Sequence, residues 1–202
     1  PIFTYPNGVS KNRNKSIKDR RSNNYLRFAF ISSKFYPWHG IDILMDSIEN
    51  DFDAFLSENI EIYLIGNIEL HIEEEIKRSK KLNKILRVCG FLEEEKILKK
   101  LELCDGGISS LALFRNGLNE ASSIKTRQYL SLGIPVIAGC RDTAIDLEFK
   151  YYNLVNKNNI PKILKSFKKF KKISRIEISD ESLPLISKEN SIKNLSTWLL
   201  NN

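Results

Sequence analysis

Residues 108–139 of this chain read ISSLALFRNGLNEASSIKTRQYLSLGIPVIAG, and their order indicates the architecture. The stretch opens with a short apolar run and continues into a polar loop, residues 115–120. A helix is expected next, because Ser122-Ser123 is a helix-start signal and Gly133 is a stop signal. The β-branched residues 134–138 then predict a second strand. Strand, loop, helix and strand in this order form the unit of a parallel α/β sheet.

The loop and the helix start indicate a binding site for an anion. In parallel sheets, ligands lie beyond the carboxyl ends of the strands, where the free N–H groups of a helix N-terminus face an anion. Here a loop with one carboxylate, Glu120, leads into a helix that opens with Ala-Ser-Ser at residues 121–123. Two interpretations remain open: a site for a phosphorylated ligand, and an ordinary strand-to-helix connection with serine as the N-cap.

The rest of the chain repeats this alternation. Apolar runs predict strands at residues 26–32, 60–65, 85–89, 105–113, 134–138 and 151–155. Helical spacing predicts helices at 41–55, 69–82, 93–103, 158–172 and 191–200, besides the one after Ser123, with irregular structure at 174–187 around Pro184. The prediction is a single α/β domain over residues 1–202: a doubly wound parallel (Rossmann-like) sheet of about six strands with helices on both faces.

Composition and charge exclude several classes of protein. The 202 residues are 42% apolar and 28% charged, which is typical of a soluble globular domain. No run is long enough to span a bilayer, and no signal-peptide pattern opens the chain. The net charge of +7 would suit nucleic acid, but the lysines are dispersed, so we expect no nucleic-acid partner. Peripheral contact of a basic face with the anionic inner membrane surface fits this charge better.

Cysteine and histidine usage indicates a reduced compartment and no metal site. Cys89, Cys104 and Cys140 share no CxxC spacing and leave an odd count, as expected of a cytoplasmic protein. His39 and His71 have no metal-ligand spacing. Because the chain begins without an initiator Met, we expect it to be a fragment of a longer protein.

One part of the chain resembles the donor-site signature of retaining glycosyltransferases with the GT-B architecture, family 4 in particular. The family motif is Glu, seven residues, Glu, a Tyr-Leu-Ala-type helix end and Gly-x-Pro-Val. Here Glu120 and Gln128 have that spacing, and YLSLGIPV follows from Tyr129. Pro-Asn-Gly-Val at residues 6–9 is similar to the family's junction between two domains. The resemblance covers residues 5–140 and implies the carboxyl-terminal, donor-binding half of a GT-B enzyme.

The resemblance also implies roles for individual residues. Glu120 would contact the donor sugar, and Gln128 would hold the ribose hydroxyls. The residues expected at the diphosphate are Lys34, His39, Gly40, Ala121, Ser122, Ser123, Ile124 and Lys125. The nucleobase is expected beside Gly90, Phe91 and Leu92, although the last two fit equally well as an apolar plug under the following helix.

Three positions depart from the family pattern. In the loop after the first strand, the family carries Arg and, six residues later, Lys-Gly, where this chain has Ser33 and His39 followed by Gly40. The alternative for His39 is an exposed histidine at a helix start. Gln128 replaces the second Glu, and an amide keeps one acceptor oxygen but turns the other group into a donor. Because a charged hydrogen bond is roughly twice as strong as a neutral one, we expect weaker ribose binding and not loss of the site.

By resemblance, the chain takes part in sugar transfer from a nucleoside-diphosphate sugar to a glycan or lipid-linked acceptor, with retention of configuration, in cell-surface polysaccharide synthesis. The resemblance implies neither a metal nor a cofactor besides the donor. An amino-terminal domain absent from this sequence would complete the cleft, so the chain alone is expected to be inactive. Residues 1–24 would be linker and polar loop, and residues 188–202 a helix packed on that missing domain. The alternatives are a sugar-nucleotide epimerase on the same fold and a non-catalytic binding module.

Overall fold

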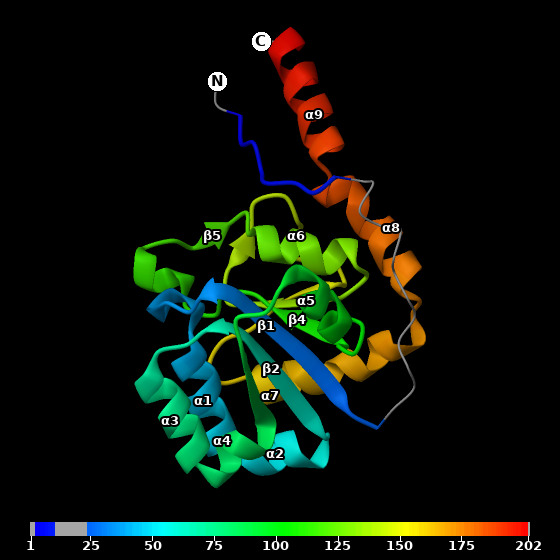
Figure 1. The fold of residues 1–202 in the computed structure, drawn as a ribbon. Helices are drawn as coiled ribbons and strands as arrows, with labels where there is room; N and C mark the ends of the chain where they lie inside the picture. The colour runs from blue at the N-terminus through cyan, green and yellow to red at the C-terminus, as the bar shows by residue number, and fades with distance from the viewer. Residues whose placement is uncertain (1–2, 11–23, 202) are drawn as a thin grey trace.

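The chain folds around one six-stranded parallel sheet, seen in the computed structural model of Figure 1. The structure describes residues 3–10 and 24–201, so most of the predicted polar loop lies outside the described residues. The strands are β1 (Leu26–Lys34), β2 (Ile60–Asn67), β3 (Leu86–Gly90), β4 (Gly106–Ile108), β6 (Val136–Ala138) and β8 (Tyr152–Leu154). Their order is β3-β2-β1-β4-β6-β8, and every pairing is parallel. The predicted doubly wound α/β sheet is confirmed.

The central residues of β1 and β2 are apolar because helices cover both faces of the sheet. Successive side chains of a strand point to opposite faces. In β1, the neighbours Phe28, Ala29 and Phe30 are nevertheless all fully buried, and residues 62–65 of β2 are buried in the same way. A sheet with one solvated face would have required alternation of apolar and polar residues, which these runs lack.

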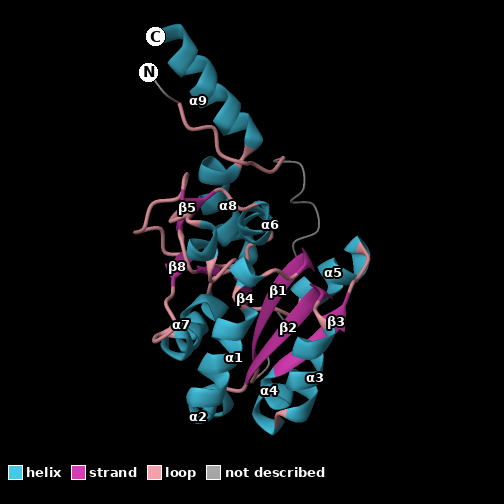
Figure 2. Ribbon diagram, turned by 90° about the vertical axis from the view of Figure 1, so that its left-hand side faces the viewer, coloured by secondary structure: helices cyan, strands magenta, loops and turns pink. Residues whose placement is uncertain are grey.

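The helices form a layer on each face of the sheet (Figures 1 and 2). One layer contains α1 (Ile41–Asn50), α2 (Phe52–Ser57), α3 (Leu70–Arg78), α4 (Lys80–Ile85), α7 (Ile160–Ser166) and the 3-10 helix η4 (Phe167–Lys172). The opposite layer contains α5 (Glu94–Leu101), α6 (Ile124–Ser131) and α8 (Arg175–Ile186). Short elements lie in the loops that follow the carboxyl ends of the strands. They are the 3-10 helices η2 (Pro37–His39) and η3 (Leu113–Asn116) and the two-stranded pair β5 (Glu120–Ala121) and β7 (Arg141–Asp142).

Several predicted elements are divided or shorter in the structure. The helix predicted at 41–55 is interrupted at Asp51, and the one at 69–82 is interrupted at Ser79. Ser79 starts a new helix because its hydroxyl accepts the N–H of Leu82 at 3.2 Å. The strand predicted at 105–113 is only three residues long, since the chain leaves the sheet after Ile108. Helical spacing of apolar residues continues through such interruptions, so the pattern alone does not reveal them.

The prediction of irregular structure around Pro184 is wrong, because this segment forms α8. The Ser174 hydroxyl caps the helix by accepting the N–H of Glu177 at 3.1 Å. Ile178 and Ile186 are fully buried, and α8 packs closely against α6. Pro184 lies in the last turn, and the buried apolar face outweighs the cost of one missing backbone hydrogen bond.

Two consecutive glycines in β4 allow a ring to approach the sheet from each side. A Cβ atom on Gly106 would lie 2.7 Å from the ring of Phe167, and one on Gly107 would lie 2.4 Å from the ring of Tyr129. The Tyr129 hydroxyl donates to the carbonyl of Ala29 at 3.0 Å and accepts the N–H of Ile31 at 3.2 Å. Tyr129 therefore fixes α6 to the edge at which β1 and β4 separate, which is the switch point of the topology.

Replacing Gly107 with alanine is expected to destabilise the fold. The new methyl group would overlap the Tyr129 ring, and overpacking of this kind costs roughly 1–3 kcal/mol. Denaturant unfolding of the variant should show a lower midpoint with an unchanged slope. An unchanged midpoint would mean that the ring shifts at no cost and that α6 is not fixed through Tyr129.

The two described ends of the chain lie side by side, outside the sheet (Figure 1). The final helix, α9 (Lys188–Asn201), projects from the body, and residues 3–10 run along it. The rings of Phe3 and Trp198 are 5.6 Å apart. Val9 forms an isolated parallel bridge with Ser187, and a Cβ atom on Gly8 would lie 2.7 Å from the backbone nitrogen of Lys188. Only glycine therefore fits at position 8, where the segment lies against the start of α9. Helical spacing alone predicted this helix only from residue 191, and it begins at Lys188.

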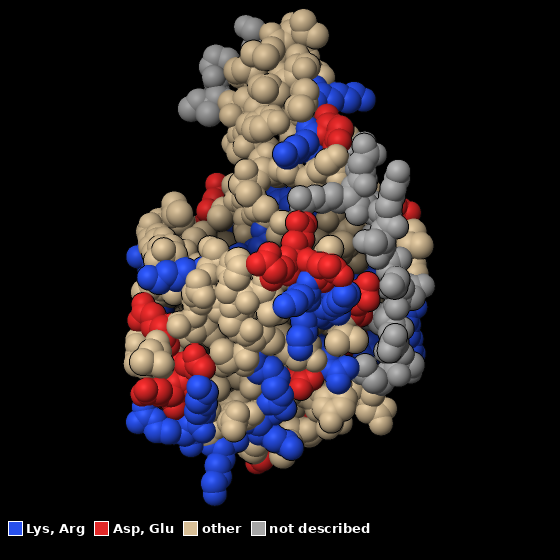
Figure 3. All heavy atoms as spheres, viewed as in Figure 1, with Lys and Arg blue, Asp and Glu red and all other residues tan. Residues whose placement is uncertain are grey.

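Charged side chains of both signs are interspersed over the body, whereas the projecting end is almost uncharged on the face shown in Figure 3. In α9 no charged residue follows Lys193, and Leu199 and Leu200 are exposed. Among the described residues, no helix combines the length and the apolar character that a bilayer-crossing helix needs.

Candidate functional site

The candidate site lies at the switch point, where two loops are joined by backbone hydrogen bonds. The N–H of Leu111 donates to the carbonyl of His39 at 2.9 Å, and the N–H of Ala112 donates to that of Trp38 at 3.2 Å. Gly40 follows with φ +76°, and a Cβ atom there would lie 3.0 Å from the Leu111 Cβ and 3.2 Å from the Ala112 nitrogen. The close approach and the left-handed backbone both favour glycine. The loop after β1 is thus held directly against the loop after β4.

His39 is buried and both of its ring nitrogens are hydrogen-bonded within its own loop. Nδ1 accepts the N–H of Tyr36 at 2.9 Å. Nε2 lies 3.2 Å from the Ser32 hydroxyl, which itself donates to the carbonyl of Lys34. The proton is therefore assigned to Nε2. Burial, followed by the nearby Lys125 ammonium, lowers the pKa of His39 to about 4. The ring is neutral near pH 7 and shapes the loop; it is not the exposed histidine of the alternative interpretation.

The N-terminus of α6 faces this loop. The helix begins at Ile124, with Ser123 as the extended N-cap residue. The Ser123 side chain makes no capping hydrogen bond within the described residues. The first N–H groups of an α-helix have no partner inside the helix, so the start of α6 can offer them to a ligand. The Thr126 hydroxyl donates to that of Ser109 at 3.3 Å, which holds this turn over the end of β4.

Lys125 carries a buried cation in the first turn of α6. Its Nζ is inaccessible to solvent and makes no hydrogen bond or ion pair in the part of the chain that the structure describes. The centroid of the Phe30 ring lies 5.8 Å from Nζ. Burial lowers the pKa of Lys125 to about 8. A buried lysine without a counter-charge is unfavourable, and this position combines it with a helix N-terminus.

Glu120 and Gln128 are both exposed and lie on either side of the start of α6. Glu120 belongs to β5, which pairs with β7 and projects as a small lobe. Gln128 lines two hollows. One of about 560 Å³ is shared with the amino-terminal segment and Lys188. The other, of about 310 Å³, lies between α5 and α6 over Ile31 of β1.

Other predicted site residues lie farther along the same edge. Lys34 is exposed at the end of β1, with Nζ 5.3 Å from the centroid of the Tyr36 ring. Gly90 ends β3 with φ +65°. Phe91 after it is 64% exposed, whereas Leu92 packs partly on the core. The apolar-plug interpretation therefore fits Leu92 and does not fit Phe91. The structure brings His39, Gly40 and Lys125 together. Phe91 lies apart from them, directly after β3, which is an edge strand of the sheet.

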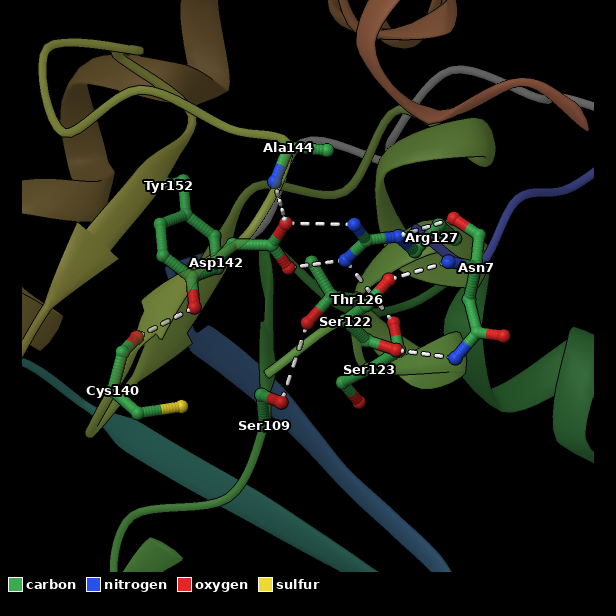
Figure 4. Close-up of polar contacts among 10 residues, drawn as sticks. All are labelled: Asn7, Ser109, Ser122, Ser123, Thr126, Arg127, Cys140, Asp142, Ala144 and Tyr152. Carbon is green, nitrogen blue, oxygen red and sulfur yellow. Dashed lines mark hydrogen bonds and ion pairs between the residues drawn. The ribbon is translucent and has the colours of Figure 1, made fainter. Parts of the chain in front are cut away.

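A buried polar network below the site was not predicted from the sequence (Figure 4). Arg127 forms a two-pronged ion pair with Asp142 of β7, and both side chains are almost completely inaccessible to solvent. Asp142 also accepts the N–H of Ala144 at 3.0 Å. The Arg127 Nε donates to the carbonyl of Asn7 at 3.0 Å. One signal was present: Arg127 precedes Leu130 by three residues, which places it on the buried face of the helix.

Among the described residues, no group of three or more His, Cys, Asp or Glu side chains is arranged to hold a metal ion. His71 is exposed on α3, with Nδ1 3.5 Å from a carboxylate oxygen of Glu69.

Comparison with known proteins places the fold. No family model matches the sequence, and no curated protein sequence matches it. Among solved structures, TarM is 17% identical over 91% of this chain with a TM-score of 0.59. The carboxyl-terminal domain of LpcC, a group 1 glycosyl transferase from Francisella tularensis, is 12% identical over 87% with a TM-score of 0.60. HepE of Anabaena, solved with UDP-glucose, is 15% identical over 89% with a TM-score of 0.61.

These neighbours are GT-B glycosyltransferases, and the likeness shows that this chain has the fold of their carboxyl-terminal domain. It spans 96% of the LpcC domain but only 36% of the TarM chain and 50% of the HepE chain. Two of these neighbours are therefore much longer than the chain described here.

Proposed function

We propose that this chain is the donor-binding half of a retaining glycosyltransferase that uses a nucleoside-diphosphate sugar. The observation that carries the proposal is the buried ammonium of Lys125 in the first turn of α6, which has no hydrogen-bond partner among residues 3–10 and 24–201. An anion bound there would compensate that charge and accept hydrogen bonds from the helix N-terminus. The HepE structure, with UDP-glucose on the same fold at 15% identity, supports a nucleotide sugar as the anion.

In this proposal, the donor lies across the switch point. The diphosphate binds the backbone N–H groups at residues 121–124 together with Lys125. His39 and Gly40 hold the loop that forms the opposite wall, and Lys34 adds charge at its rim. The ribose binds Gln128, which faces the hollow between α5 and α6, and the base extends toward Gly90, Phe91 and Leu92. The sugar projects toward Glu120.

The same arrangement would favour departure of the diphosphate. Negative charge grows on the leaving diphosphate as the bond to the sugar breaks, and fixed positive charge at that place stabilises the transition state. Lys125 and the dipole of α6 supply such charge without a metal or a further cofactor. Glu120 would bind the sugar by accepting hydrogen bonds from the hydroxyl groups of the sugar. The acceptor, a glycan or lipid-linked glycan, would approach from an amino-terminal domain that contacts the uncharged end of α9.

A panel of nucleotides tests the proposal directly. One nucleoside diphosphate among UDP, GDP and ADP is expected to raise the melting temperature of the chain, by roughly 5–10 °C at a hundredfold excess over its Kd. The corresponding nucleoside should give a much smaller shift, because it lacks the groups that pair with Lys125. If none of the three diphosphates raises the melting temperature, the chain is not a donor-binding domain.

A non-catalytic binding module is the second candidate, favoured by Gln128 in place of a carboxylate and by the neutral His39 in place of a cation. Incubating a protein that contains both GT-B halves with a labelled donor and an acceptor separates the possibilities. Labelled acceptor indicates transfer, an altered free donor indicates epimerisation, and unchanged donor indicates binding alone.

A further inference from the structure

The amino-terminal segment is hydrogen-bonded to the start of α6 through Asn7, although 115 residues separate the partners along the chain. The backbone N–H of Asn7 donates to the Ser122 hydroxyl at 2.6 Å. Its side-chain amide donates to the Ser122 carbonyl, also at 2.6 Å. Asn7 therefore holds both the side chain and the backbone of the residue that lies just before the N-cap of α6 (Figure 4).

Arg127 connects the same segment to the interior. Its Nε donates to the Asn7 carbonyl at 3.0 Å, and one terminal nitrogen lies 3.5 Å from the Ser123 carbonyl. Both terminal nitrogens, including the one near Ser123, donate to the Asp142 carboxylate, so that one fully buried side chain joins the amino-terminal segment, the N-cap of α6 and β7. Charge-assisted and two-pronged hydrogen bonds of this kind fix geometry strongly.

The far side of the segment is held as well. Gly8 lies against the backbone of Lys188, and the N–H of Lys188 donates to the Val9 carbonyl at 3.0 Å. Residues 7–9 are therefore clamped between the start of α6 and the junction of α8 and α9. A displacement of this segment would move Ser122 and Ser123, and with them the first N–H groups of α6.

We propose that Asn7 and Arg127 are positioning residues for the anion site, so that the affinity of the site for a nucleoside diphosphate depends on where residues 7–9 lie. The inference rests on the proposed function, because the ligand is the diphosphate of the donor. Neither residue touches that ligand. Asn7 acts through Ser122, and Arg127 acts through Asn7 and Ser123.

The test compares Asn7→Ala with the wild-type chain in two measurements. The first is the Kd for the nucleoside diphosphate that binds best and for its parent nucleoside. The second is amide hydrogen exchange at residues 122–125. Asn153→Ala is the matched control, because the Asn153 amide also donates to backbone carbonyls, those of Val136 and Lys150, but lies in β8.

Asn7→Ala is expected to weaken diphosphate binding roughly threefold to tenfold, the effect of one hydrogen bond, and to speed exchange at residues 122–125. Binding of the nucleoside should not change, and Asn153→Ala should alter neither quantity. Equal loss for nucleoside and diphosphate, or no loss for either, would overturn the positioning role while leaving the proposed function in place. If the wild-type chain binds no nucleoside diphosphate, the proposed function fails and the positioning role fails with it, whatever the exchange rates show.

Discussion

Replacing Lys125 with methionine is expected to stabilise the ligand-free chain and to weaken its binding of nucleoside diphosphates. The two effects have one cause, the buried ammonium that makes no hydrogen bond or ion pair among the described residues. Its pKa of about 8, against an ordinary value of 10.5, corresponds to a cost on the order of 3 kcal/mol for keeping the charge in the folded chain. Methionine fills similar space without the charge.

The binding loss follows from the same charge. A hydrogen bond between charged groups contributes about 1.5–3 kcal/mol, so the Kd for the diphosphate should rise about 10- to 100-fold. Thermal melting and calorimetric titration measure the two effects separately. Lys96→Met is the control, because Lys96 is an exposed lysine of α5, and it should change neither quantity much. If Lys125→Met melts lower than the wild type and binds the diphosphate equally well, the lysine is a packing residue and not a ligand.

The Lys125 charge also makes the stability of the chain and its affinity for diphosphates depend on pH, each with a definite sign. Below about pH 8 the ammonium is charged in both the folded and the unfolded chain, and its full cost is present. Between about pH 8 and 10.5 the folded chain releases this proton while the unfolded chain keeps it, so this group's destabilisation declines as pH rises. His39, with a pKa of about 4, stays neutral across that window. Diphosphate affinity should fall as pH rises through 8, and Lys125→Met should remove that dependence.

Replacing Asp142 with asparagine is expected to cause the largest loss of stability. The change keeps the shape of the side chain but leaves the fully buried Arg127 without its counter-charge. Breaking a buried pair from one side costs about 3–5 kcal/mol, which for a domain of this size lowers the melting temperature by roughly 10 °C or more.

Asp42→Asn provides a matched control, because it breaks an ion pair with Arg115 in which the Asp42 side chain is 55% exposed. Exposed pairs contribute about 0–1 kcal/mol, so this variant should melt close to the wild type.

Removing both buried partners, with Arg127→Met and Asp142→Leu together, should recover much of the stability lost in Asp142→Asn. It should not recover diphosphate affinity, since Asn7 and Ser123 would still lack the guanidinium. If Asp142→Asn melts like Asp42→Asn, the buried pair does not hold the structure as described.

The sheet could be predicted from the sequence because each strand is a run of apolar residues that must be covered on both faces. Residues 26–32 and 60–65 are of this kind, and both are strands at nearly those bounds. Breaks within helices could not be predicted in the same way. Ser79 interrupts a helical pattern whose apolar spacing continues on both sides, and a single hydroxyl hydrogen bond determines where the new helix starts.

The candidate site was only partly predictable, for a physical reason. The helix start at Ser123 and the position of Lys125 near it depend on neighbours in sequence. The burial of Lys125, the hydrogen bonding of both His39 nitrogens and the pairing of Arg127 with Asp142 depend on packing between distant segments. The sequence does not show whether a polar side chain will find a hydrogen-bond or ion-pair partner in a distant segment. The partner of Arg127 is Asp142, 15 residues away along the chain, in a strand too short to predict.

Residues 3–10 and α9 lie side by side and run in opposite directions, which limits how any attached body could move. Both segments leave the main body at one place, with Val9 bridged to Ser187 and Phe3 against Trp198. A domain joined through both would hang on two adjacent tethers. It could rotate about the line through the two points where the segments leave the main body. Twisting about the direction of the segments themselves would stretch one tether relative to the other. Opening and closing over the sheet edge would then have essentially one degree of freedom, and its axis would pass within a residue or two of Asn7.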